Sequence, residues 1–146
     1  MKIVVQRVLS ASVEIDNNLH SSIDNGLLVL IGISNTDDEE TVEWVSNKLI
    51  NLRIFNDDDG KMNKSILDIE GEILLVPNFT IYGDVKKGYR PNFMSSAKPN
   101  ISAPLFNSLI EKLKDLYPSK IQCGIFGADM KVKLTNDGPV TIIIEK

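Results

Sequence analysis

The hydrophobic positions of the chain follow two patterns: short runs typical of β-strands, and two longer stretches that repeat at helical intervals. Near the N-terminus, runs rich in valine and isoleucine predict strands at Ile3–Leu9 and Ser12–Ile15. Asp16-Asn17-Asn18 has the composition of a turn, and a further strand is expected at His20–Ile23. The chain should therefore open with a hairpin.

Two uninterrupted apolar runs have the character of strands that are buried on both faces. Leu27–Ile33 follows Asn25-Gly26, a pair that favours a type I′ turn, and it suits a central strand. The second run is Ile73–Val76. Pro77 should end its regular pairing, because proline has no backbone N–H to donate.

The residues after Pro77 form a candidate binding position. Asn78 and Thr80 follow at a spacing of two, so an extended backbone would aim both side chains the same way, with Phe79 turned to the opposite side. An amide and a hydroxyl at the end of a buried strand could hold a small polar ligand. Polar strand ends also occur at the surface of many folds, so this segment alone leaves both interpretations open.

Apolar residues that recur every three or four positions predict two amphipathic helices. Thr36-Asp37-Asp38-Glu39 has the spacing of a capping box, so the first helix is expected at about Asp37–Asn51. The second should begin with Ser102 as its cap and Pro104 in its first turn, and should run to Tyr117-Pro118. Each helix would cover one face of a sheet.

The rest of the chain completes a single domain that spans residues 1–146. Further strands are expected at Arg53–Phe55, Lys120–Gly124, Lys131–Thr135 and Val140–Glu145. The order of strands and helices predicts an α/β fold with mixed, largely antiparallel β-sheets that form a barrel-like core. Two amphipathic helices would pack outside this core.

Composition narrows the class of protein. With 146 residues, 42% hydrophobic and 25% charged, the chain is an ordinary globular domain. No apolar run approaches the ~18 residues of a membrane span, and Arg7 stands where a secretory signal would still be apolar. We therefore expect a cytoplasmic protein without a membrane segment. The single Cys123 has no partner for a disulfide or a zinc site, and a net charge of −4 limits nucleic-acid contacts to local patches.

The most acidic stretch, residues 56–60, does not fit a calcium-binding loop. If Gly60 takes the glycine position of that loop, the first and twelfth ligand positions fall on Phe55 and Ile66, where carboxylates are required. A solvated turn is the better interpretation. We expect no metal site and no cofactor.

A second loop is basic. Residues 84–93 combine lysine and arginine with Tyr89 and Phe93, and this is the one cluster in the chain where cations alternate with aromatic residues. Such a combination can bind phosphates while it stacks a base.

Conventional hydrolytic machinery is missing. The one histidine, His20, lies in the predicted hairpin, where it is better explained as a neighbour of a surface turn than as a catalytic base. There is no zinc-type cluster and no glycine-rich phosphate loop followed by a helix. If the protein is a catalyst, its rate should come from positioning and main-chain donors, with help from a threonine hydroxyl or from the substrate itself.

Two segments resemble the signature motifs of the D-aminoacyl-tRNA deacylase family. Asn78-Phe79-Thr80 is similar to the end of the family's Ser-Gln-Phe-Thr, and residues 136–141, Asn-Asp-Gly-Pro-Val-Thr, are similar to its Asn-x-Gly-Pro-Val-Thr. Further similarity follows in order along the chain, at Val5–Val8, Gly26–Leu30, Arg53–Phe55, Gly60–Asn63, Lys87-Gly88, Arg90-Pro91 and Phe126–Met130. This number of ordered matches is far more specific than either short motif.

The resemblance implies a homodimer that hydrolyses the ester between a D-amino acid, or glycine, and the 3′-terminal adenosine of tRNA. Gly138 and Pro139 would form a cis peptide that reaches into the pocket of the partner subunit and rejects L-aminoacyl-tRNA. Thr80 corresponds to the family's catalytic threonine. Main-chain N–H groups near Phe79 and Thr80 would stabilise the oxyanion, with help from the 2′-hydroxyl of the tRNA, and Asn78 would take the place of the family's glutamine.

Further roles are implied by position. Arg7 would support the Gly-Pro loop, Phe93 and Met130 would line the pocket for the terminal adenosine, and Asn136 opens the closing motif. A snorkelling strand residue remains the alternative for Arg7, and ordinary core packing the alternative for Phe93 and Met130.

The chain departs from the family pattern at two neighbouring positions. Pro77 stands in place of the usual serine, and Asn78 in place of the usual glutamine. Asparagine is one methylene shorter, so any contact of the longer amide must be missing, shifted or bridged by water.

Four alternatives remain open. The protein could be a non-catalytic nucleic-acid-binding dimer with the same fold, or a hydrolase of small esters unrelated to tRNA. If it is a deacylase, Thr80 could be the nucleophile, in place of assistance from the 2′-hydroxyl of the tRNA. From spacing alone, residues 136–139 would be a turn with a trans proline.

Overall fold

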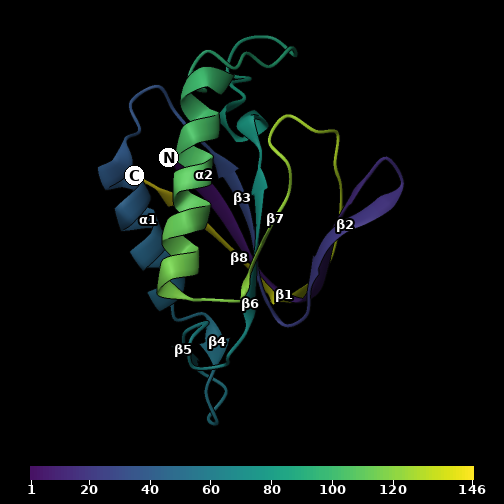
Figure 1. The fold of residues 1–146 in the computed structure, drawn as a ribbon, viewed down its shortest axis with the longest axis vertical. Helices are drawn as coiled ribbons and strands as arrows, with labels where there is room; N and C mark the ends of the chain where they lie inside the picture. Colours follow the sequence, from purple (N-terminus) through teal and green to yellow (C-terminus); the bar gives the residue numbers. More distant parts are fainter.

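The computed structural model describes residues 1–146, and Figure 1 shows two helices side by side against a strongly curved sheet. In chain order the elements are β1 (Lys2–Ile15), β2 (Asn18–Ile23), β3 (Gly26–Gly32), α1 (Glu39–Asn51), β4 (Phe55–Asn56), β5 (Met62–Lys64), β6 (Glu72–Pro77), the 3₁₀ helix η1 (Phe79–Tyr82), α2 (Pro99–Leu116), β7 (Ile121–Cys123) and β8 (Lys131–Glu145). Neither α1 nor α2 combines the length and the apolar character that a membrane crossing needs.

β1 is the strand around which the main sheet is built. β2 and β3 pair antiparallel with successive halves of β1, and β8 pairs antiparallel along nearly its whole length. β6 then joins β3, and β7 joins β6, both in parallel. The predicted α/β class, with a mixed, largely antiparallel and barrel-like sheet and two outer helices, is confirmed.

The opening strands are longer than predicted. The runs at Ile3–Leu9 and Ser12–Ile15 form one strand, because β8 also pairs with Ser10 and Ala11 between them. Asn25-Gly26 does not close a hairpin between β2 and β3. Both strands run along β1 in the same direction and register, so the chain continues forward at this point.

The two strands predicted at Lys131–Thr135 and Val140–Glu145 are likewise one strand, β8. In place of the turn expected between them, β8 has an irregular segment within its pairing with β1. Gln6 of β1 pairs with Thr141, whereas Val8 pairs with Asn136, so residues 137–140 lie together opposite one residue of β1.

Both helices exist, but each begins at a different residue from the one predicted. α1 begins at Glu39, and Asp38 caps it by accepting hydrogen bonds from Thr41 N and Thr41 Oγ1, both at 2.9 Å. The capping box that starts at Thr36 is therefore wrong, because a better cap lies two residues later. α2 begins at Pro99, a position where proline suits the first turn.

The predicted start of α2 at Ser102 therefore falls inside the helix. Its side chain is buried, and Ser102 Oγ donates to Lys98 O at 3.0 Å instead of capping. Pro104 also lies within α2 and not in its first turn. The helix gains an additional N-terminal turn that borders the loop of residues 84–93 and the cavity described below.

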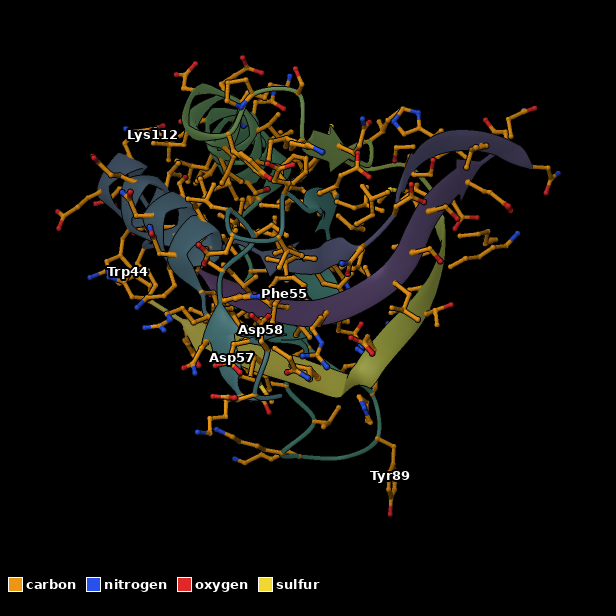
Figure 2. All side chains as sticks on the ribbon, turned by 90° about the horizontal axis from the view of Figure 1, so that it is seen from below. Trp44, Phe55, Asp57, Asp58, Tyr89 and Lys112 are labelled. Atoms are coloured by element: carbon orange, nitrogen blue, oxygen red, sulfur yellow. The ribbon has the colours of Figure 1, made fainter.

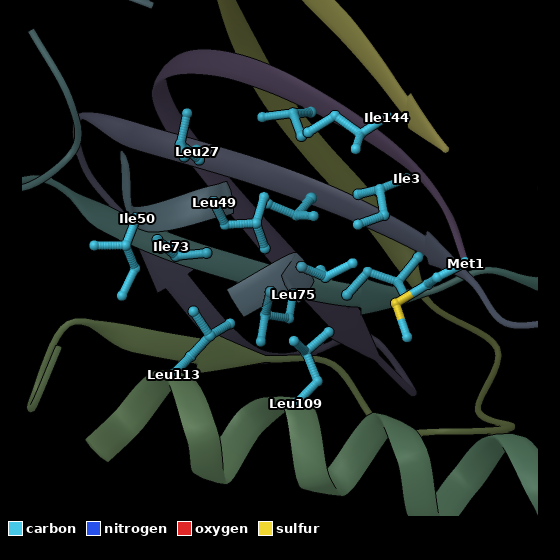
Figure 3. Packing of buried hydrophobic residues seen from close by; sticks show 14 of the residues in the cluster. Met1, Ile3, Leu27, Leu49, Ile50, Ile73, Leu75, Leu109, Leu113 and Ile144 are labelled. Atoms are coloured by element: carbon cyan, nitrogen blue, oxygen red, sulfur yellow. The ribbon is translucent and has the colours of Figure 1, made fainter. Parts of the chain in front are cut away.

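The sheet has one face covered by helices and a second face with a smaller buried cluster, which is open where it borders the threonine cavity described below. Ile73 and Leu75 of β6 point toward the helices, into a core of 25 buried residues, and Figure 3 shows Leu109 and Leu113 of α2 directed at Leu75. The alternate β6 residues belong to a smaller cluster of 7 on the opposite face. The candidate site lies where this second face meets the end of β6.

Candidate active site

The chain bends sharply after Pro77, so the extended segment expected at Asn78–Thr80 is not present. Asn78 continues the sheet by one residue, donating its N–H to Ile31 O at 2.7 Å, and its side chain then caps η1. Asn78 Oδ1 accepts hydrogen bonds from Thr80 N at 3.3 Å and from Thr80 Oγ1. Because asparagine can bond the N–H two residues ahead, it favours a turn here. The amide and hydroxyl are adjacent, as predicted, but they bind each other.

This turn separates two cavities. The first, here called the aromatic cavity, has a volume of about 340 Å³ and includes Ile31, Phe93 and Phe126 in its lining. The second, the threonine cavity, has a volume of about 550 Å³ and includes Gln6, Leu30, Thr80 and Met130. Both cavities share the residues of the ridge between them, which are Pro77, Asn78, Phe79 and Gly127. A ligand with two unlike parts could therefore cross the ridge, with one part in each cavity.

Phe93 and Met130 lie on opposite sides of this ridge. The ring of Phe93 packs edge-on against Phe79, with centroids 5.1 Å apart and planes at 74°. Gly83 lets the Phe93 ring approach the backbone, because a Cβ there would lie 3.0 Å from Phe93 Cε1. Met130 packs against Gly124 in the same way, where a Cβ would meet Met130 Sδ at 2.5 Å. The two residues therefore line different cavities, not a single pocket.

Arg7 anchors the irregular segment of β8. Arg7 is buried, with 6% of the residue exposed. Its Nη1 donates hydrogen bonds to Ile54 O at 2.8 Å and to Asn56 Oδ1 at 3.2 Å. Its Nε lies 2.9 Å from Asp137 Oδ2 and forms an ion pair with it. Nε also donates to Asp137 O at 3.3 Å. Asn136 closes the base of the segment, since its Nδ2 donates to Arg7 O at 3.3 Å and Val140 O at 3.0 Å. Arg7 thus binds the residue that precedes the Gly-Pro pair, and its support of the Gly-Pro loop remains a prediction.

The Gly138–Pro139 peptide bond is cis, as the resemblance implied. Gly138 has a φ of 121°, a backbone conformation that L-residues other than glycine rarely adopt. A Cβ added at Gly138 would lie 3.1 Å from Arg7 Nη2. Both Gly138 and Pro139 are exposed, and neither lines the aromatic or the threonine cavity of its own chain. The site residues thus fall into two groups, one at the ridge and one around Arg7, and Gly138 and Pro139 of the second group do not reach either cavity of the chain.

Comparison with known proteins assigns the family. The family model for D-Tyr-tRNA(Tyr) deacylases matches residues 4–145. The chain belongs to this family. D-aminoacyl-tRNA deacylases of Flavobacterium psychrophilum and Bacteroides fragilis are 51% and 48% identical to it over 145 residues, which cover 99% of this chain and 97% of each relative. The predicted enzyme class, an aminoacyl-tRNA ester hydrolase, is therefore confirmed at the level of the family.

Two solved structures share the fold. A structure of the c-Myc DNA Unwinding Element Binding Protein has a TM-score of 0.95 and 42% identity, covering 100% of this chain and 99% of that one. A probable eukaryotic D-amino acid tRNA deacylase has a TM-score of 0.83 at 18% identity, with coverage of 98% and 97%. The similarity thus extends over the whole deacylase fold, including the ridge and β8.

The hydrogen bonds at the ridge of this family member define what Thr80 can do. Its hydroxyl proton is directed to Asn78 Oδ1, so the lone pairs of Thr80 Oγ1 remain free to accept a hydrogen bond from a ligand. The Thr80 N–H is also bound to Asn78 Oδ1. The N–H of Phe79, the first residue of η1, has no acceptor within that turn and is the better oxyanion donor of the two.

Gln6 is a site residue that the sequence analysis missed. It lines the threonine cavity, and its Nε2 donates to Thr141 Oγ1 at 3.3 Å, linking the ridge side of the sheet to the closing motif on β8. The signal that could have found it is a polar side chain between Val5 and Arg7 in a strand whose other neighbours are apolar. Its role depends on pairing between β1 and β8, which lie far apart in sequence.

Among the other titratable residues, Asp129 lines the threonine cavity and Lys98 the aromatic cavity, whereas His20, Tyr82 and Cys123 line neither. His20 is exposed on β2, in agreement with its interpretation as a surface residue. Burial raises the pKa of Tyr82 in η1 and of the half-buried thiol of Cys123, so both stay protonated at neutral pH. No three His, Cys, Asp or Glu side chains gather in a way that could hold a metal ion.

Proposed function

We propose that the protein hydrolyses the ester of D-aminoacyl-tRNA, and of mischarged glycyl-tRNA, and leaves L-aminoacyl-tRNA intact. The observation that carries this proposal is the ridge around Asn78 and Phe79. It separates the aromatic cavity from the threonine cavity, whose lining includes the polar residues Thr80 and Gln6. An aminoacylated adenosine has these two unlike parts, a flat base and an amino acid, joined at the ester. A tRNA substrate also fits the cytoplasmic location expected from the sequence.

In this proposal the terminal adenine enters the aromatic cavity, and the ester lies over the ridge. The rings of Phe93 and Phe79 can contact the base. The volume of the aromatic cavity, about 340 Å³, is that of a small-ligand pocket. The amino acid then points into the threonine cavity beside Met130. Met130 would therefore contact the aminoacyl end of the substrate and not the base.

Hydrolysis then needs little side-chain chemistry. Water attacks the ester carbonyl carbon, the carbonyl oxygen becomes an oxyanion held by the Phe79 N–H, and the bond to the ribose 3′-oxygen breaks. The adjacent 2′-hydroxyl of the tRNA takes a proton from the attacking water and passes its own proton to the leaving 3′-oxygen, so that the products are the free amino acid and tRNA with both ribose hydroxyls intact. Thr80 Oγ1 accepts a hydrogen bond from the substrate's ammonium group and so positions the carbonyl, without acting as a nucleophile.

Chiral selection is proposed to come from a second subunit. Gly138 and Pro139 are exposed, directly follow Asp137, which Arg7 binds, and are absent from the cavities of their own chain. In a two-fold dimer this segment would enter the threonine cavity of the partner and form a rigid wall. An L side chain would collide with the wall, whereas a D side chain would point away and glycine has nothing to exclude.

The direct test is to incubate the purified protein with D-aminoacyl-, glycyl- and L-aminoacyl-tRNA and follow loss of the ester. We expect rapid loss of the first two and retention of the third. Equal loss of D- and L-aminoacyl esters would overturn the chiral selection. A substrate that ends in 2′-deoxyadenosine should react at least about 100-fold more slowly, and an equal rate would remove the role of the 2′-hydroxyl.

The shared site can be tested by mixing two variants. Leu30→Trp should fill the threonine cavity and abolish hydrolysis, whereas Gly138→Ala combined with Pro139→Ala should disrupt the wall and admit L-aminoacyl-tRNA. In an equal random mixture, half of the subunits with the altered wall pair with a Leu30→Trp subunit, whose intact wall enters their cavity, so hydrolysis of L-aminoacyl-tRNA should fall to roughly half of that by the same amount of the wall variant alone. No fall, with dimers verified by sedimentation, would place the wall and the pocket in the same subunit.

A non-catalytic nucleic-acid-binding dimer is the second candidate. It is favoured by one observation, the 42% identical structure that is named as a DNA unwinding element binding protein. Retention of all three aminoacyl-tRNAs, together with binding of RNA or DNA, would support this alternative over the deacylase.

A further inference from the structure

A basic loop projects from the rim of the aromatic cavity. It spans Asp84–Asn92, and two main-chain hydrogen bonds of 2.9 and 3.0 Å between these two residues close its base. Figure 1 shows it at the top of the view, beyond the N-terminal end of α2. The loop is therefore an ordered projection with a defined attachment, and we call it the basic loop.

The cations of the basic loop have no partners in the chain. Lys86, Lys87 and Arg90 are exposed, and none of them takes part in an intramolecular ion pair. The single carboxylate in the loop, Asp84, accepts a hydrogen bond from Lys86 N at 2.8 Å. The lysines that form ion pairs, such as Lys64, Lys114 and Lys131, lie elsewhere in the chain, beside Asp or Glu. The basic loop therefore concentrates unpaired positive charge on a protein of net charge −4.

Tyr89 lies at the tip of the basic loop and is fully exposed. Figure 2 shows its ring pointing away from all other elements. A tyrosine gains nothing for folding in this position, because it buries no apolar surface. An exposed ring between unpaired cations is, however, the arrangement that stacks a base of a single strand while its phosphates are neutralised.

The basic loop is joined directly to the proposed adenosine site. Phe93 follows the loop, packs on Phe79 and lines the aromatic cavity, and Gly83 at the other end contacts the Phe93 ring. Lys98 continues the positive charge along the same rim. A strand whose last base occupies the aromatic cavity would therefore leave the cavity at this rim, beside the loop.

We propose that the basic loop binds the single-stranded nucleotides immediately upstream of the terminal adenosine. Lys86, Lys87 and Arg90 would contact their phosphates, and Tyr89 would stack on one base. This inference rests on the proposed function and adds a second binding surface to it. The loop supplies affinity for the polynucleotide, whereas the two cavities recognise the aminoacyl-adenosine.

The test compares a whole substrate with its terminal fragment. The variant Lys86→Gln/Lys87→Gln/Arg90→Gln should lose about 10- to 100-fold in kcat/KM on D-tyrosyl-tRNA, mostly through KM. Its activity on D-tyrosyl-adenosine, which has no upstream nucleotides, should stay within about twofold of wild type. Tyr89→Ala should lose about tenfold on the tRNA substrate, and Tyr89→Phe should retain its activity.

Salt dependence gives a second measurement. When a protein binds a single strand, each phosphate contact contributes about −0.7 to the slope of log affinity against log salt concentration. The loss of three contacts should therefore make this slope less steep by about 2. A charge-matched control, Lys61→Gln/Lys112→Gln/Lys114→Gln, removes three cations far from the cavity rim, and Figure 2 shows Lys112 far from Tyr89. The control should leave both the slope and kcat/KM unchanged.

The outcomes separate the two proposals. Equal losses on both substrates, no loss on either, or the same effect from the control would overturn the role of the basic loop while the deacylase activity stands. Wild-type protein that hydrolyses neither D-tyrosyl-tRNA nor D-tyrosyl-adenosine would overturn the proposed function itself, and the inference with it.

Discussion

The two faces of the sheet are made from alternate residues of the same strands, yet they differ in almost every property. On the face that α1 and α2 cover, Ile73 and Leu75 are completely buried within the larger core. On the other face, Leu28 and Val76 are also buried, but Leu30 is half-buried and Leu134 is 38% exposed around the threonine cavity. One face is complete within the chain, and the other is open around the threonine cavity.

This difference follows from the two-residue period of a strand. Each strand can use one set of side chains for packing and leave the other set for a ligand or a second subunit. Away from the aromatic cavity, which Ile31 and Ile33 of the covered face also line, the covered face should therefore determine the stability of the protein, and the open face its activity. Substitutions on the two faces of the paired strands β3 and β6 can test that separation.

The largest effect is expected from Leu75→Ala on the covered face. Removing this side chain should lower the free energy of unfolding by about 2–5 kcal/mol, because it creates a cavity in the closed core. The activity of the molecules that remain folded should stay within about twofold of wild type. Urea denaturation and kcat/KM measured on the same preparation check both expectations.

The matched variant is Leu30→Ala on the open face. It should lose less than half as much stability as Leu75→Ala but roughly tenfold in kcat/KM, because Leu30 lines the threonine cavity. If both variants changed stability and activity in the same ratio, the two faces would not be functionally distinct.

Arg7→Met should produce the next largest effect. It is an exception to the division between the two faces, because it should change both stability and selectivity. Arg7 lies on β1, but its guanidinium serves the irregular segment of β8 that is proposed to enter the partner's cavity. Its loss leaves buried carbonyl groups without donors and should cost about 2 kcal/mol. Rejection of L-aminoacyl-tRNA should also weaken. Denaturation together with the ratio of D- to L-ester hydrolysis measures both.

Arg53→Met is the control for this variant. Arg53 also donates to a main-chain carbonyl, that of Asn63 at 2.5 Å, but its side chain is exposed. Its replacement should change stability by less than about 0.5 kcal/mol and leave selectivity unaltered. A loss of selectivity in Arg53→Met equal to that in Arg7→Met would show that the effect does not arise at the Gly-Pro segment.

The sequence predicted the covered face well, because that face is encoded by periodicity. The uninterrupted run Ile73–Val76 and the spacing of Leu109 and Leu113 report burial directly, and both elements are present in the structure. The candidate site at Asn78 and Thr80 was predicted from local order in the chain, strengthened by family resemblance. These signals are contained within short segments.

Features that depend on competition or on distant pairing could not be predicted. Asp38 replaces Thr36 as a cap because its carboxylate reaches Thr41, and the motif alone does not rank the two. Asn25-Gly26 continues along β1 because the register of β2 and β3 is set by a third strand. The placement of Phe93 and Met130 in different cavities likewise depends on tertiary packing.

Thr80→Val tests the chemistry of the open face with a smaller effect. If Thr80 Oγ1 only accepts a hydrogen bond from the substrate, its removal should lower kcat/KM about tenfold and change stability little, because the residue is exposed. Thr80→Ser keeps the hydroxyl and should retain most activity. A loss of more than about 1,000-fold in the valine variant, with a covalent intermediate in rapid-quench experiments, would make Thr80 the nucleophile.

The smallest effect returns to the covered face, at the cap of α1. Hydrogen bonds from Thr41 lower the pKa of Asp38 below 3.8, so the folded state favours its charged form. The stabilisation is therefore complete above the unfolded pKa and is lost as the pH falls through the lower, folded value. Asp38→Ala should lower the Tm by about 2–4 °C at pH 7, and this difference should shrink toward about pH 3. Asp38→Ser, a neutral cap, should keep most of the Tm and show less dependence on pH, and deacylation by either variant at 25 °C should equal that of wild type. A pH-independent difference between Asp38→Ala and wild type would show that the carboxylate charge contributes nothing to the cap.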